Sequence, residues 1–295
     1  MKIKHIEPEI PDRDQQAKLA AAAKAKLRTA IAQVERYRRE LEKLTGCLVN
    51  VKRSAFDLDT DGTLTFVPGQ SKSGGKYFIA LHPMEAIDET YVLARLLMQL
   101  EFEHKDCVAG EPVIFAPNTS CIQSTLAHYE ASQAEQRKSA VAFGNALISF
   151  TRELFIESHL NAKMPALDSL QKKHALILGC NRADSVANYY RVPEQTRTAR
   201  NQAFATICAA NALQWDHLLK DTNISGYYRQ LSIWPRAETI HEIFKSHFAG
   251  AKPGAISQTL KDVCTLLGNP DMIRHHSSPA LGVRGKPATS SLEVN

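Results

Sequence analysis

Two side chains close to residue 100 have the types and the spacing of a metal site. Glu101 and His104 lie three residues apart near the end of an amphipathic segment. In the pattern His-Glu-x-x-His, two imidazoles one helical turn apart bind zinc, and the carboxylate between them polarises a water molecule. Leu100 stands where the first imidazole would be. A zinc site here therefore needs further ligands, for which His82 and His128 are the candidates.

The segment 74–110 resembles the core of zincin-type metallopeptidases of the SprT-like kind. Such cores have a glycine-tyrosine strand, a leucine-rich helix, the metal motif and then a glycine; the matching positions are Gly75, Tyr77, 93–97, Glu101, His104 and Gly110. The first histidine of the family motif is missing. The resemblance implies either a metal hydrolase, with Glu101 as general base and His104 as zinc ligand, or a pseudoenzyme that keeps the scaffold without activity.

Glu238 and His241 repeat the Glu-x-x-His spacing further along the chain. Two such motifs on different helices, joined by carboxylates from two more helices, are typical of di-iron bundles. Glu130, Glu153 and Glu157 lie on intervening segments and could supply those carboxylates. Because so short a motif arises readily by chance, we favour no cofactor, and zinc is the alternative.

A different chemistry is indicated by the segment 185–196, which resembles the helix-turn-helix of DNA-binding proteins. A small residue, Ala187, would let two helices approach, and the guanidinium groups near the second helix suit phosphates or guanine edges. The alternative is an ordinary helical hairpin with a charged rim. The expected nucleic-acid contacts are Arg191, Thr196, Arg197 and Arg200.

Composition limits the class of protein. The chain has 295 residues, a formal charge of +5 and six cysteines without a Cys-x-x-Cys pair, so neither a zinc ribbon nor a disulfide framework is indicated. No apolar run is long enough to cross a membrane, and the first residues do not form a hydrophobic signal segment. We expect a cytoplasmic protein without a membrane partner.

Most of the elements that must position these residues are predicted to be helices. Residues 12–45 form one long helix, with Leu27, Ile31, Val34 and Leu41 on its apolar stripe. Alternating residues in 48–51 and 64–67, on either side of Asp61-Gly62, predict a β-hairpin. Further helices are expected at approximately 88–107, 119–138, 139–162, 165–179, 183–191, 194–219, 235–249 and 255–267.

The predicted fold is thus mainly α with a small β-hairpin or sheet near the N-terminal third. Its expected parts are a long N-terminal helix over 1–46, an α+β core over 47–162, a helical region over 163–276 and a disordered tail over 277–295. The leading hypothesis is a non-enzymatic binding protein that engages nucleic acid or a nucleoprotein assembly. The alternatives are the zincin-like protein and a helical protein–protein adaptor, with residues 12–45 also able to form a homo-oligomer.

Overall fold

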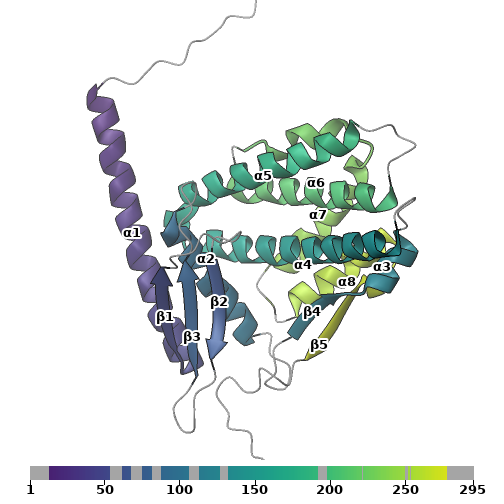
Figure 1. Cartoon of the computed structure of the whole chain (residues 1–295). Coiled ribbons are helices and arrows are strands. Elements are labelled where there is room, and N and C mark those ends of the chain that lie inside the picture. The colour runs from purple at the N-terminus through teal and green to yellow at the C-terminus, as the bar shows by residue number, and fades with distance from the viewer. Residues whose placement is uncertain are drawn as a thin grey trace, which may run out of the picture.

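The computed structural model describes residues 13–53, 62–67, 75–81, 88–105, 113–126, 132–191, 198–220, 222–249, 252 and 254–277. This part of the chain is mainly α with two small sheets, as the sequence predicts (Figure 1). Its α-helices are α1 (Arg13–Thr45), α2 (Glu89–Lys105), α3 (Thr119–Thr125), α4 (Gln133–Lys163), α5 (Asp168–Tyr190), α6 (Ala199–Leu219), α7 (Trp234–Phe248) and α8 (Ala255–Leu267). Short 3-10 helices are η1 (Pro165–Leu167), η3 (Ile224–Gln230) and η4 (Pro270–Met272).

The first sheet contains β1 (Leu48–Arg53), β2 (Gly62–Val67) and β3 (Lys76–Leu81) in the order β1-β3-β2. β3 pairs in parallel with β1 and antiparallel with β2. The predicted hairpin between 48–51 and 64–67 is therefore wrong, because β3 lies between the two strands. Tyr77, Ile79 and Leu81 alternate as buried residues along β3, and α2 packs against β2 and β3.

The second sheet joins segments that are far apart in the sequence. β4 (Val113–Pro117) pairs antiparallel with β5 (Ile273–Ser277), and next to them the backbone N–H of Asn118 donates to the Met272 carbonyl at 2.8 Å. We expected a helical region up to residue 276 and a disordered tail from residue 277 onward. The structure instead places His275 in β5, against the ring of Phe115, while residues 278–295 lie outside the described part.

Two predicted helix boundaries are wrong because single helices run through them. α4 begins at a capping box formed by Ser132 and Glu135 and continues through residues 138–139 without a break. α5 likewise continues through residues 179–183, although Gly179 is a weak helix former. A Cβ at Gly179 would lie 2.4 Å from Ile224 Cγ2, so the glycine allows α5 to approach η3 closely.

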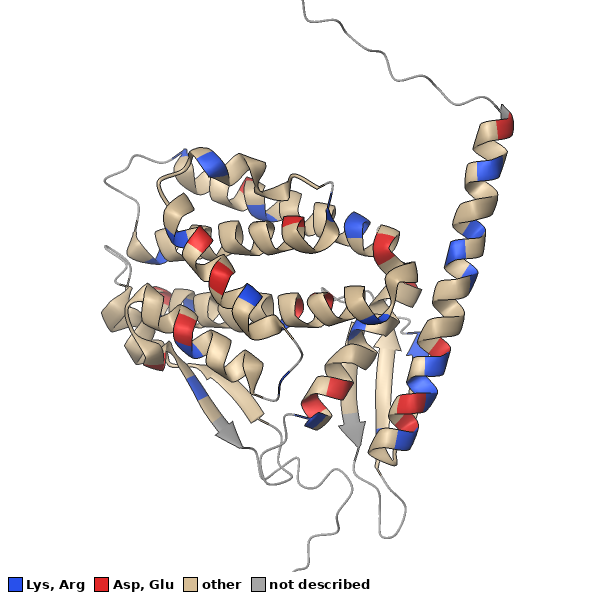
Figure 2. Cartoon of the chain, turned by 180° about the vertical axis from the view of Figure 1, so that it is seen from behind, with Lys and Arg blue, Asp and Glu red and all other residues tan. Residues whose placement is uncertain are grey.

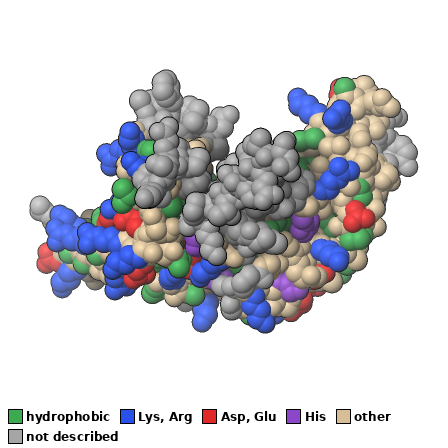
Figure 3. Space-filling view, turned by 90° about the horizontal axis from the view of Figure 1, so that it is seen from below, with side chains coloured by type: hydrophobic (Ala, Val, Ile, Leu, Met, Phe, Trp, Pro, Cys, Tyr) green, Lys and Arg blue, Asp and Glu red, His purple; other side chains and the backbone are tan. Residues whose placement is uncertain are grey.

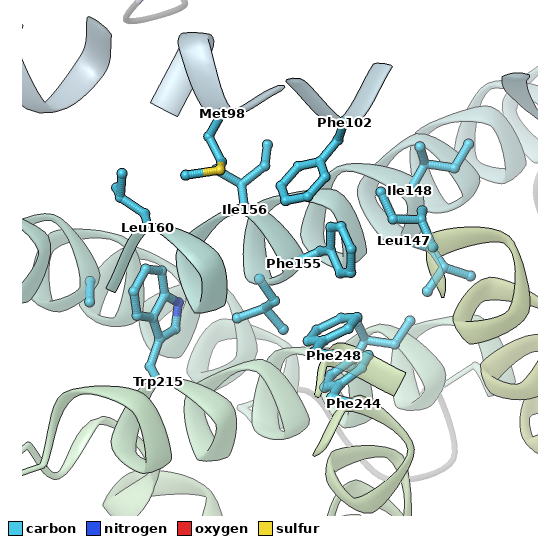
Figure 4. Close-up of a cluster of buried hydrophobic side chains, with 14 of the residues drawn as sticks. Met98, Phe102, Leu147, Ile148, Phe155, Ile156, Leu160, Trp215, Phe244 and Phe248 are labelled. Atoms are coloured by element: carbon cyan, nitrogen blue, oxygen red, sulfur yellow. The ribbon is translucent and has the colours of Figure 1, made fainter. Parts of the chain in front are cut away.

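The core is one cluster of buried apolar residues that extends from Ala30 to Ile273. α4 is its central element and packs against α2, α3, α6, α8 and β4. Figure 4 shows Met98 and Phe102 of α2 on one side of α4 and Phe244 and Phe248 of α7 on another. None of the helices in the described ranges is long and apolar enough to cross a bilayer.

Only half of α1 packs on this core, and the other half extends away from it (Figure 1). The buried stripe consists of Ala30, Val34, Tyr37 and Leu41, so Val34 and Leu41 confirm the prediction. Ile31 does not belong to the stripe, because it is 45% exposed. Every residue in 14–26 is exposed.

Candidate functional site

Glu101 lies where α1, α2 and α4 meet, and it is nearly buried there. Its carboxylate accepts hydrogen bonds from the Tyr37 hydroxyl, from Lys105 Nζ at 2.6 Å and from Lys163 Nζ at 2.9 Å. Although burial raises the pKa of Glu101, these donors together outweigh it and lower the pKa from 4.5 to about 2. Lys163 also lies 4.2 Å from the centre of the Tyr37 ring.

These contacts correct the interpretation of Glu101 as a general base. A carboxylate that activates water needs a pKa near the working pH and an oxygen that can reach the water. Both oxygens of Glu101 instead hold lysines, one from its own helix and one from α4, and its pKa is low. Glu101 therefore joins three helices as the centre of a small ion-pair network.

His104 lies one helical turn after Glu101 on α2. Within the described residues, no group of three or more His, Cys, Asp or Glu side chains is arranged to hold a metal ion. His82 and His128 lie outside those residues. The residues that the structure describes therefore give no support to a zinc site at Glu101 and His104.

The second Glu-x-x-His motif is also not joined to the carboxylates proposed for it. His241 lies on α7, with its ring 5.7 Å from that of His217, and desolvation is the main reason that its pKa falls to about 4. Glu153 and Glu157 lie on α4 and are each paired with an arginine, while Glu130 lies outside the described residues. The di-iron interpretation therefore has no assembled ligand set.

The four residues of the predicted helix-turn-helix surface do not form one exposed surface among the described residues. Arg191 ends α5, is exposed, and donates to Asn188 Oδ1 at 3.1 Å. Thr196 and Arg197 lie outside the described residues. Arg200 is only 2% exposed, and its guanidinium donates to the Leu126 carbonyl at 2.9 Å.

Arg200 is thus a correction to the predicted surface, because its guanidinium satisfies buried carbonyl groups and cannot reach a phosphate in this structure. The helix arrangement differs as well. α5 and α6 pack against each other and run side by side in Figure 1, whereas the two helices of a helix-turn-helix cross steeply. This geometry fits the alternative, a helical hairpin.

The most heavily buried charges lie between α2, α4 and α5. Glu157 is fully buried and accepts hydrogen bonds from the Tyr91 hydroxyl at 2.6 Å and from Gln171 Nε2 at 2.7 Å; Arg95 Nε lies 2.8 Å from it. Burial is the main influence on this carboxyl, and it raises the pKa of Glu157 to about 7 despite the neighbouring Arg95.

A second buried pair lies one helical turn away on α4. Glu153 Oε2 accepts from Arg182 Nη2 at 2.6 Å, and Arg182 Nη1 donates to Asn211 at 2.5 Å. His174 lies nearby with its ring 5.1 Å from that of Tyr91, and burial lowers its pKa to about 3.

Sequence reasoning singled out Glu153 and Glu157 for iron but missed their true partners. The sequence does contain one signal of a buried charged pair. Two glutamates lie one helical turn apart on either side of the apolar run 154–156, and buried carboxylates need cations or donors. Nothing in the sequence identifies Arg95 and Arg182 as those cations, because they come from other helices.

A cleft of about 340 Å³ opens beside this charged layer, between α2 and α4. Both helices line it, together with Gly62 of β2. The lining side chains are Val92, Arg95, Leu96 and Gln99 of α2 and Ser149, Arg152, Glu153 and Ile156 of α4.

The outer face of α1 is the other unusual surface. With about 100° between successive residues, five basic side chains fall within a sector of about 80° that lies opposite the buried stripe. They are Lys18, Arg28, Arg36, Arg39 and Lys43, and all are exposed. The other residues of this sector between Lys18 and Lys43 are Ala21, Ala25 and Ala32. We call these eight residues the α1 outer stripe.

Charge is less ordered elsewhere on the molecule. Figure 2 shows Lys and Arg along the whole length of α1, while its acidic residues gather in the half that packs on the body, apart from Asp14 at the start. On the face shown in Figure 3, basic side chains are mixed with acidic and apolar ones.

Comparisons with family models, with curated proteins and with solved structures gave no significant match to this chain.

Proposed function

We propose that this protein binds nucleic acid through the α1 outer stripe. The observation that carries the proposal is the composition of this stripe, which between Lys18 and Lys43 contains only basic residues and alanines. At about 1.5 Å per residue, the stripe is roughly 38 Å long. Phosphate backbones present a regular line of negative charge over such a length, and basic side chains bind it by releasing counterions.

The basic side chains of the stripe are available for this role. Among the described residues, only Arg36 of the five has an acidic partner within salt-bridge distance, Glu40 at 3.9 Å, and both side chains are highly exposed. Such surface pairs contribute little to stability and exchange readily. Arg38 lies outside the sector of the stripe, and it instead donates to the Val49 carbonyl and supports the fold.

The alanines support the same interpretation. Ala21, Ala25 and Ala32 are exposed and have no long side chain that would hold a partner away from the helix. A helix with small and basic residues on one face can lie close to a sugar-phosphate backbone, as the basic helices of several DNA-binding proteins do. Alanine also has the highest helix propensity, which helps the projecting half of α1 to stay helical without packing.

The test compares two triple variants that remove the same charge. Arg28→Ala/Arg36→Ala/Arg39→Ala removes three positions of the stripe, and Arg229→Ala/Lys245→Ala/Lys261→Ala removes three exposed charges from the body. All six side chains are exposed, so both variants should fold with stability changes of about 0.5 kcal/mol per site or less. Fluorescence anisotropy with a labelled DNA duplex and a labelled single-stranded RNA gives the affinities.

We expect the stripe variant to bind at least about ten-fold more weakly at low salt, with a salt slope reduced by roughly 0.9 per lost contact on duplex DNA. The body variant should bind nearly as the unmodified protein does. Equal losses in both variants would show diffuse attraction without a site. If the folded protein binds neither nucleic acid at low salt, the proposal is wrong and an acidic protein becomes the partner to test.

A further inference from the structure

The cleft between α2 and α4 is separate from the α1 outer stripe, and none of its lining residues belongs to α1. Its volume of about 340 Å³ is at the lower end of the range for ligand pockets. Leu96 and Ile156 give it apolar walls, while Arg95, Gln99, Ser149 and Arg152 supply donor groups.

One wall of the cleft contains a carboxylate with unused hydrogen-bonding capacity. Glu153 is nine-tenths buried, and its Oε2 is held by Arg182. The other oxygen, Oε1, is buried and accepts no hydrogen bond from the residues that the structure describes. A buried charged acceptor left in this state is costly, and a donor from a bound molecule would remove that cost.

Above about pH 7, where Glu157 is ionised, the charges around the cleft balance before any ligand enters. Three guanidinium groups each face one carboxylate: Arg95 lies 2.8 Å from Glu157, Arg152 lies 3.2 Å from Glu103, and Arg182 lies 2.6 Å from Glu153. A ligand with a net charge would upset this balance in a partly desolvated place. A ligand that carries both charges would preserve it.

We propose that this cleft binds a small zwitterion of amino-acid size with an aliphatic side chain. Its ammonium group donates to Glu153, its carboxylate meets Arg152, whose side chain is one-third exposed, and its side chain lies between Leu96 and Ile156. Guanidinium and carboxylate pair well because two parallel N–H groups match two oxygens.

Calorimetric titration of the full chain with the standard L-amino acids tests this proposal. We expect binding by at least one aliphatic amino acid, such as leucine. Isocaproate lacks the ammonium group of leucine and isoamylamine lacks its carboxylate, so each should bind at least about ten-fold more weakly, which corresponds to roughly 1.4 kcal/mol.

Two variants locate the binding. Ser149 is exposed at the cleft, so Ser149→Leu should fill it and abolish binding without unfolding the protein. Arg152→Gln should weaken binding about ten-fold, whereas Arg137→Gln, an exposed position on the same helix, should not. The proposal is wrong if no amino acid binds the folded protein, or if both cleft variants bind as the unmodified chain does.

Discussion

Glu101 and Glu157 show how far two carboxyl groups can be moved in opposite directions by their surroundings. Glu101 accepts from two ammonium groups and a phenol, and its pKa falls to about 2. Glu157 accepts from Tyr91 and Gln171 and lies beside Arg95, but complete burial dominates and its pKa rises to about 7. Solvent exclusion separates the two cases, because removing water penalises the charged form.

The raised pKa of Glu157 predicts a specific pH dependence of stability. The unfolded chain releases this proton near pH 4.5, whereas the folded protein keeps it until about pH 7. Between these values the folded state binds more protons, so this group makes the free energy of unfolding fall as the pH rises. His174, whose pKa is lowered to about 3, acts in the opposite sense over much of this range, so the contribution of Glu157 must be isolated.

Denaturant unfolding of the unmodified protein and of Glu157→Gln between pH 4.5 and 7 isolates the contribution of Glu157 to stability. Relative to the variant, the unmodified protein should lose stability on the order of 3 kcal/mol between pH 4.5 and 7. A difference that stays flat or rises with pH would show that Arg95 keeps Glu157 ionised in the folded state.

Burial is also the reason that residue-level prediction from the sequence succeeded only in part. Arg191 and Arg200 lie nine residues apart in one basic segment, yet the first is exposed and the second is buried against backbone carbonyl groups. Glu101 has the spacing of a catalytic residue but the contacts of a structural one. Residue type and spacing identify chemistry that is available, whereas the helix that packs opposite decides its use.

At the level of elements, α1 combines two environments in one continuous helix. Leu41 is 1% exposed in the half that packs on the body, and Leu19 is 62% exposed in the half that projects. Leu41→Ala should therefore lower the free energy of unfolding by about 2–5 kcal/mol, since it removes core contacts and leaves a cavity.

Leu19→Ala is the matched control on the same helix, and it should change stability by about 0.5 kcal/mol or less. Thermal and denaturant unfolding measure both variants. If Leu19→Ala is as destabilising as Leu41→Ala, or dissociates an oligomer, then another copy of the chain covers the projecting half, as the homo-oligomer hypothesis proposes.

Helices were more predictable than strand pairing because their signals are local. α1, α7 and α8 begin and end within a residue or so of the predicted positions, and Gly268 follows the last residue of α8 with a positive φ. The order β1-β3-β2 and the pairing of β4 with β5 depend on contacts between distant segments. Periodicity within one strand carries no information about which strand lies beside it.

For the whole molecule, the two faces of α1 differ in their surroundings. Its inner stripe of Ala30, Val34, Tyr37 and Leu41 fixes it to the body. Its outer stripe faces away from the body along the entire length between Lys18 and Lys43. We infer that a partner as long as a nucleic-acid backbone can follow this face of the helix.

The most direct test of this account asks which face of α1 lies against the nucleic acid. A photoreactive residue is placed at Ala25, in the outer stripe, or at Ala23, which is also exposed but lies about 160° around the helix. Ser246 on α7 serves as a control on the body. After irradiation with labelled duplex DNA or single-stranded RNA at low salt, we expect strong crosslinking from position 25 and little from positions 23 and 246. Equal crosslinking from positions 23 and 25, or crosslinking mainly from position 246, would contradict the proposal that the α1 outer stripe binds nucleic acid.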